Sequence, residues 1–173
     1  MEYRSILIID SVSHLDNDFI RLVSEIPVVL TEIGNNKRNV GLYFGRFFAD
    51  ETAVFYLFGK TGSTQIHMGL ATYVEVMDKY IQAGVIFFAH LEERSKQELI
   101  WCRNYLPDLP YVLAVVDDRA ESIDDVRAFF SEPKETPILH FDPQDAKTAQ
   151  AIVIRLLEQS ADGRAVLKKW HVF

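Results

Sequence analysis

The sequence of 173 residues lacks several features that special sites and environments require. It holds a single cysteine, Cys102, which excludes an internal disulfide and any multi-cysteine zinc or iron–sulfur site. No apolar run approaches the about 20 residues that span a membrane, and the opening Met-Glu-Tyr-Arg-Ser is followed by only four apolar residues before Asp10. We therefore expect a cytoplasmic chain without a signal peptide and without membrane insertion.

Basic residues are also scarce. Eighteen Lys and Arg stand against 25 Asp and Glu, which gives a net charge of −7, and no basic run offsets it. A surface of this sign repels duplex nucleic acid and anionic lipid, so the sequence predicts no nucleic-acid partner.

Apolar residues, in contrast, are plentiful. They make up 49% of the chain and include twelve Phe and seven Tyr, which excludes a disordered chain and suffices for one packed core. We expect a single domain over residues 1–160 and a C-terminal tail over 161–173. The tail is apolar, so it either packs on the domain or contacts another protein.

Five short apolar runs have the composition of strands that are buried on both faces, because they are rich in β-branched and aromatic residues. They cover residues 5–9, 53–58, 84–89, 111–116 and 137–141. A sixth run, 40–48, is joined to the second by a short polar turn, which predicts an antiparallel hairpin.

Stretches of helical period alternate with these runs, at 15–24, 70–81, 96–106 and 144–159, and Ser122 is a typical N-cap of one more helix. The alternation predicts a three-layer α/β fold. Its open, mainly parallel sheet of six strands has one antiparallel edge strand and helices on both faces. Ligand sites of such folds lie at the carboxyl ends of the strands.

Three segments carry a resemblance to a known family. They are Phe-Ile-Arg-Leu-Val-Ser-Glu-Ile at 19–26, Val-Gly-Leu-Tyr-Phe-Gly-Arg at 40–46 and Tyr-Leu-Phe-Gly-Lys-Thr-Gly at 56–62. In order and spacing the chain resembles the Ras-like small GTPases from about residue 6 to 160, in particular a bacterial branch that pairs with roadblock-type regulators. The resemblance implies a P-loop GTPase-like fold, a role in signalling, and GTP or GDP with Mg²⁺ as ligands.

The phosphate loop departs from that family. Where the family has G-x-x-x-x-G-K-[ST], this chain has Asp10 for the first glycine, Leu15 for the second, Asp16 for the lysine and Asn17 for the hydroxyl residue. At roughly 4 Å and an effective dielectric constant of about 20, exchanging lysine for aspartate turns about 4 kcal/mol of attraction into a similar repulsion. Asp10, Ser13, Leu15, Asp16 and Asn17 therefore form a degenerate phosphate loop.

Three further elements are degraded. The loop 35–39 offers no threonine for magnesium, residues 59–62 lack a carboxylate and are followed by Ser63 in place of glutamine, and Val-Asp-Asp-Arg at 116–119 replaces the guanine-reading N-K-x-D. The sequence thus predicts a pseudo-GTPase without catalytic residues, cofactor or metal, which works as a protein-interaction module.

Two alternatives remain open at this loop. A weak or atypical GTPase would bind GTP or GDP with Mg²⁺ through Ser13, Asn17 and Asp117 or Asp118. A pocket lined by Asp10, Ser13 and Asp16 would suit a cation or an amine, unless the acids are solvated loop residues. His90 and His140 end buried strands and are predicted to be hydrogen-bonded rather than metal ligands.

The hairpin supplies the predicted partner surface. Side chains alternate along a strand, so Tyr43 and Phe47 lie on one face of residues 40–48, and Arg46 and Phe48 lie on the other. Unless the edge strand is well covered, part of it meets a protein, either a roadblock-type regulator or a second copy of this chain. The predicted surface consists of Tyr43, Arg46, Phe48, Lys60 and Thr61, with the loops 27–39 and 59–69 beside it.

Overall fold

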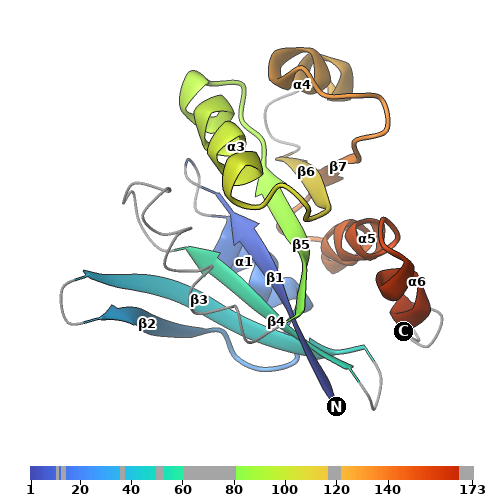
Figure 1. The fold of residues 1–173 in the computed structure, drawn as a ribbon. Coiled ribbons are helices and arrows are strands. Elements are labelled where there is room, and N and C mark those ends of the chain that lie inside the picture. Colours follow the sequence, from blue (N-terminus) through green and yellow to red (C-terminus); the bar gives the residue numbers. More distant parts are fainter. Residues whose placement is uncertain are drawn as a thin grey trace.

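Figure 1 shows the computed structural model, which describes residues 1–10, 12, 15–35, 38–49, 53–60, 81–116 and 122–167. The strands are β1 (Glu2–Ile9), β2 (Val29–Asn35), β3 (Arg38–Phe48), β4 (Ala53–Lys60), β5 (Ile81–Phe88), β6 (Tyr111–Val116) and β7 (Ile138–Phe141). The helices are α1 (Asp16–Val23), α3 (Glu93–Tyr105), α4 (Ile123–Phe130), α5 (Ala146–Leu157) and α6 (Ala161–Leu167).

The strands form one mixed sheet in the order β2-β3-β4-β1-β5-β6-β7. β1 pairs in parallel with β4 and β5, and β6 pairs in parallel with β5 and β7. β3 is antiparallel to both of its neighbours, β2 and β4. The predicted α/β class with a mainly parallel sheet is confirmed.

The strand count is corrected from six to seven. The segment 27–39, predicted as a loop, contains β2, whose residues pair with β3 from Val29 opposite Phe44 to Asn35 opposite Arg38. The antiparallel strand β3 is therefore second from the edge, and β2 is the edge strand. Pairing with β2 satisfies the outer backbone groups of β3, which an edge position would leave unpaired.

Helices cover the sheet on two sides, as Figure 1 shows. α1 and α5 pack on one face against the β1 residues Ile6 and Ile8, while α3 and α4 pack on the other against Leu7 and Ile9. Alternate residues of β1 thus enter two separate cores. This explains why the strand is a continuous apolar run rather than an alternating one.

Two glycines let α1 lie directly on the backbone of the sheet. A Cβ atom added at Gly45 of β3 would meet the Ile20 side chain, and one added at Gly59 of β4 would lie 2.8 Å from Asp16 Oδ2. The close approach fixes the first turn of α1 against the carboxyl end of β4.

Residues 161–167 of the predicted tail form α6, which contacts α5, and Leu167 packs against the core on that face. Residues 168–173 and the predicted helix at 70–81 lie outside the described residues, apart from position 81. In the described part of the chain, no helix combines the length and apolar character needed to cross a membrane.

Candidate functional site

The loop between β1 and α1 lies at the carboxyl edge of the sheet, where the fold predicts a ligand site. Asp10 follows β1, and Asp16 opens α1. Gly59 of β4 pairs with Ile8, and His90 follows the end of β5 on the other side of β1. Four polypeptide segments therefore meet at this edge.

The carboxylate of Asp10 is bound by the loop that follows it. Its Oδ1 accepts the N–H of Val12 at 3.0 Å, and its Oδ2 accepts the N–H of Leu15 at 2.7 Å. The side chain is buried, with the residue 3% exposed. In a working phosphate loop, backbone N–H groups of this kind point at a bound phosphate. Here they point at a carboxylate of the same chain.

His90 supplies a third polar contact to the same carboxylate. Its Nε2 lies 3.1 Å from Asp10 Oδ1, and both residues are buried. The backbone N–H of His90 donates to Ser95 Oγ at 3.2 Å, which fixes the position of the histidine. The prediction that His90 is hydrogen-bonded at a strand end is confirmed. Its partner could have been predicted, since Asp10 and His90 follow neighbouring parallel strands.

Asp16 stands where the family has the phosphate lysine, and it is 0% exposed. Neither carboxyl oxygen has a hydrogen-bond partner among the residues that the structure describes. Burial raises the pKa of Asp16 from 3.8 to about 7; the amide of Asn17 lowers it, and the charge of Asp10 raises it further. Asp10 and Asp16 are therefore buried, and the alternative that they are solvated loop residues is wrong for both.

Of the remaining predicted nucleotide contacts, only Asn17 belongs to the described part of the chain. Asn17 is half-buried in the first turn of α1. Ser13, Asp117 and Asp118 lie outside the described residues. Within the described ranges, no group of three or more His, Cys, Asp or Glu residues could hold a metal ion.

The hairpin residues divide between two faces, as strand alternation predicts. Tyr43 is half-buried and packs against the core under α1. Arg46 and Phe48 lie on the opposite face, where the guanidinium carbon of Arg46 is 5.4 Å from the centre of the Phe48 ring. Lys60 is the last residue of β4, and Thr61 lies outside the described residues. The predicted surface is therefore split, and Tyr43 does not share a face with Arg46 and Phe48.

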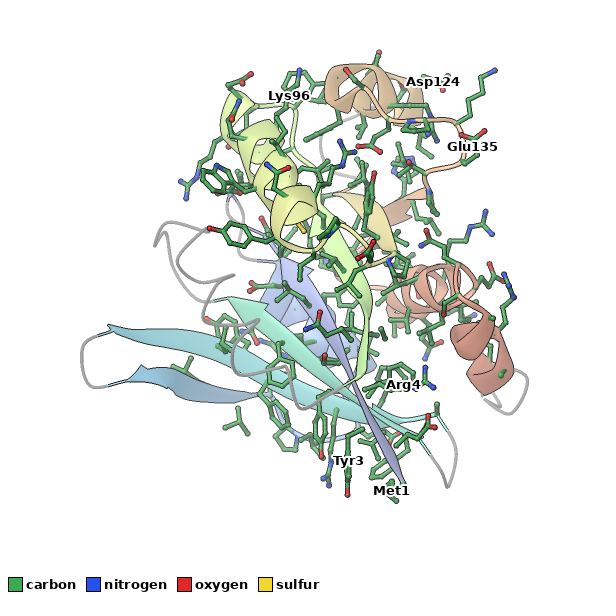
Figure 2. All side chains as sticks on the ribbon, viewed as in Figure 1. Met1, Tyr3, Arg4, Lys96, Asp124 and Glu135 are labelled. Atoms are coloured by element: carbon green, nitrogen blue, oxygen red, sulfur yellow. The ribbon has the colours of Figure 1, made fainter. Side chains whose placement is uncertain are left out.

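Aromatic side chains gather on the face of β1, β3 and β4 that is turned away from α1. The ring of Tyr56 stacks with Tyr3 at 6.0 Å and with Phe44 at 5.4 Å between centroids. Tyr3 and Phe48 are 47% and 37% exposed. Figure 2 shows Tyr3 near the start of β1, at one end of this face. We call this surface the aromatic face. It consists of Tyr3, Phe44, Arg46, Phe48 and Tyr56, and Val29 of β2 lies at its border.

Comparisons with known proteins concern the fold. No family model and no curated protein matches the sequence. Among solved structures, the cytosolic domain of the T. maritima FeoB iron transporter in a GDP form matches 90% of this chain with a TM-score of 0.62 and 11% identity. The chain spans 62% of that FeoB chain.

Two more solved structures agree. The isolated G domain of T. maritima FeoB has a TM-score of 0.61 and 9% identity, with 91% of this chain and 98% of that chain covered. A bacterial selenocysteine-specific elongation factor, EF-Sec, has a TM-score of 0.60 and 12% identity, with 92% of this chain and 29% of that chain covered. At such identities the likeness concerns the fold alone, and this chain has a GTPase-like G-domain fold.

Proposed function

We propose that this protein is a non-catalytic module with a GTPase-like fold, which binds another protein and has lost GTP binding and hydrolysis. The observation that carries the proposal is the position of the Asp10 carboxylate. It accepts the N–H groups of Val12 and Leu15 and contacts His90, so the anion site of the loop is filled from within the chain.

A nucleotide would have to displace this internal anion. Moving Asp10 away would leave two backbone N–H groups and a buried histidine to be re-satisfied, and the carboxylate would then face the phosphates. At roughly 4 Å and an effective dielectric constant of about 20, each contact between like charges costs about 4 kcal/mol. Since about 1.4 kcal/mol is a tenfold change, the full cost of one such contact moves micromolar affinity to about millimolar.

Asp16 disfavours a nucleotide in a second way, because the site lacks a lysine charge. It holds a carboxyl where a nucleotide requires an ammonium group, and it lies buried against Gly59 rather than turned into solvent. The sequence independently supports the loss of GTP binding and hydrolysis. Residues 59–62 lack the carboxylate of the resembled family, and residues 116–119 lack its guanine-reading asparagine–lysine pair.

The aromatic face supports the protein-binding part of the proposal. Tyr3, Phe48 and Val29 are exposed on or beside this sheet face, while Phe44 and Tyr56 are partly buried against the core. An exposed apolar patch of this kind is typical of a protein-binding surface. The resemblance suggests two classes of partner, a roadblock-type regulator and a second copy of this chain.

A titration with fluorescent GTP, GDP and ATP, with and without Mg²⁺, tests the loss of nucleotide binding. The G domain of T. maritima FeoB serves as the positive control for the assay. We expect no saturable binding by this protein below millimolar nucleotide. Saturable micromolar binding would contradict the proposal and favour the weak GTPase that uses Ser13, Asn17 and Asp117 or Asp118.

A further inference from the structure

The register of the sheet places the members of the aromatic face in adjacent rows. Tyr56 stands opposite Arg46, and the next pair on that face is Phe58 opposite Phe44, which also faces Val29 of β2. Residues directly opposite in neighbouring strands share one face. The face is therefore continuous from β1 to the edge strand, where Val29 is 49% exposed.

Arg46 gives this face one positive charge, and none of the acids that the structure describes pairs with it. Its side chain lies over the Phe48 ring, its Nε is buried without a hydrogen-bond partner, and no ion pair within the described residues includes it. Glu25 is near in the fold, but its carboxylate accepts the backbone N–H of Phe48. The members of the aromatic face include no Asp or Glu, although the chain as a whole has a net charge of −7.

This charge pattern disfavours a second copy as the occupant. A two-fold symmetric contact joins the same patch on both subunits, so each Arg46 would meet a surface without an acid. Burying an unpaired guanidinium costs several kcal/mol, which apolar contact on a small patch does not offset. A partner that carries a carboxylate removes this cost.

On the basis of the proposed protein-binding function, we propose that the aromatic face binds an aspartate or glutamate of a partner protein. Apolar side chains flank this acid in the partner. The carboxylate pairs with Arg46, whose planar guanidinium can donate two parallel N–H bonds to it. The apolar neighbours cover Tyr3, Phe48 and Val29 and exclude water from the ion pair, as is typical of the centre of a stable interface.

Selection of short random peptides on the immobilised full chain tests this partner chemistry. We expect the enriched peptides to carry Asp or Glu next to aliphatic or aromatic residues. Exchange of that acid for Gln or Asn in a synthetic peptide should weaken binding roughly tenfold or more. Arg46→Glu should weaken it at least as much, and Arg46→Lys less.

Arg21→Glu provides the matched control, because Arg21 is an exposed arginine of α1 on the other side of the sheet. It should leave peptide binding unchanged. Enrichment of basic or uncharged peptides, binding that ignores Arg46→Glu, or a failure to enrich any peptide would overturn the proposed chemistry.

The outcomes separate this inference from the function on which it rests. Uncharged peptides that lose binding on Phe48→Ser would refute the acidic partner but keep the aromatic face as a binding surface. A dimer in sedimentation experiments that Phe48→Ser dissociates would make the occupant a second copy and refute the acidic partner. Micromolar nucleotide binding would refute the proposed loss of GTP binding, but it would not affect the conclusion from the peptide selection.

Discussion

The carboxyl edge of the sheet buries charged side chains, whereas the aromatic face exposes large apolar ones. At the edge, the charged residues Asp10 and Asp16 are buried, and the loop satisfies Asp10 internally. On the aromatic face, large apolar side chains are exposed and Arg46 has no acid partner in the described chain. In the proposed function, the edge binds no nucleotide because Asp10 already occupies the amides of its loop, and the aromatic face keeps exposed groups for a partner. The comparison favours the aromatic face, rather than the loop between β1 and α1, as the surface for the proposed function.

The largest expected effect comes from the ionisation of Asp16. Because burial raises its folded pKa to about 7 from 3.8, the folded state holds a proton that the unfolded state releases. The stabilisation is complete below pH 4 and is lost as the pH rises towards 7, about 4 kcal/mol in total at 1.36 kcal/mol per pKa unit. Urea unfolding of the wild type and of Asp16→Asn between pH 4 and 8 measures it.

Asp16→Asn keeps the shape of the side chain and removes the titration. We expect the variant to gain stability relative to the wild type as the pH rises through this window, while other groups change both proteins equally. If the difference in unfolding free energy between the two proteins stays constant from pH 4 to 8, Asp16 is not buried in the way described. The contrast between the carboxyl edge and the aromatic face would then be wrong.

The next largest effect is expected for Asp10→Ala. Removing the carboxylate leaves the N–H groups of Val12 and Leu15 and the buried His90 without their acceptor, which should cost about 3 kcal/mol of unfolding free energy. Asp124→Ala is the control, because Asp124 is exposed in the first turn of α4, as Figure 2 shows, and should change stability by less than about 1 kcal/mol. Equal small losses in both variants would refute a structural role of Asp10.

The smallest effect on stability is expected on the aromatic face. Phe48→Ser removes a side chain that is 37% exposed and should cost about 1 kcal/mol or less, whereas Phe55→Ser in the core should cost about 3–5 kcal/mol. Chemical unfolding of both variants makes the comparison. A loss for Phe48→Ser as large as for Phe55→Ser would mean that this ring is part of the core and is not held open for a partner.

Most of the fold could be predicted from the sequence, because strands buried on both faces are continuous apolar runs that local composition reveals. β2 could not, since Thr31, Glu32, Gly34 and Asn35 interrupt its apolar pattern. Its strand conformation depends on pairing with the outer edge of β3, which is a tertiary contact that local propensity does not report.

The candidate site was predictable in its charge and not in its geometry. The replacement of glycine and lysine by Asp10 and Asp16 predicts that phosphate is repelled. The Asp10 carboxylate accepts the N–H groups of its own loop because of the directions of the loop backbone. Residue types alone do not determine those directions. The Asp10–His90 contact was within reach, because both residues follow neighbouring parallel strands, but it required the strand order.

NMR spectra of the Val12 and Leu15 amides during addition of GDP and Mg²⁺ test the internal anion most directly. Both N–H groups are bound to Asp10 in this account, so their chemical shifts should stay unchanged up to millimolar nucleotide. Saturable shifts of both amides at micromolar GDP would show that the loop releases Asp10 for phosphate, and would contradict the account.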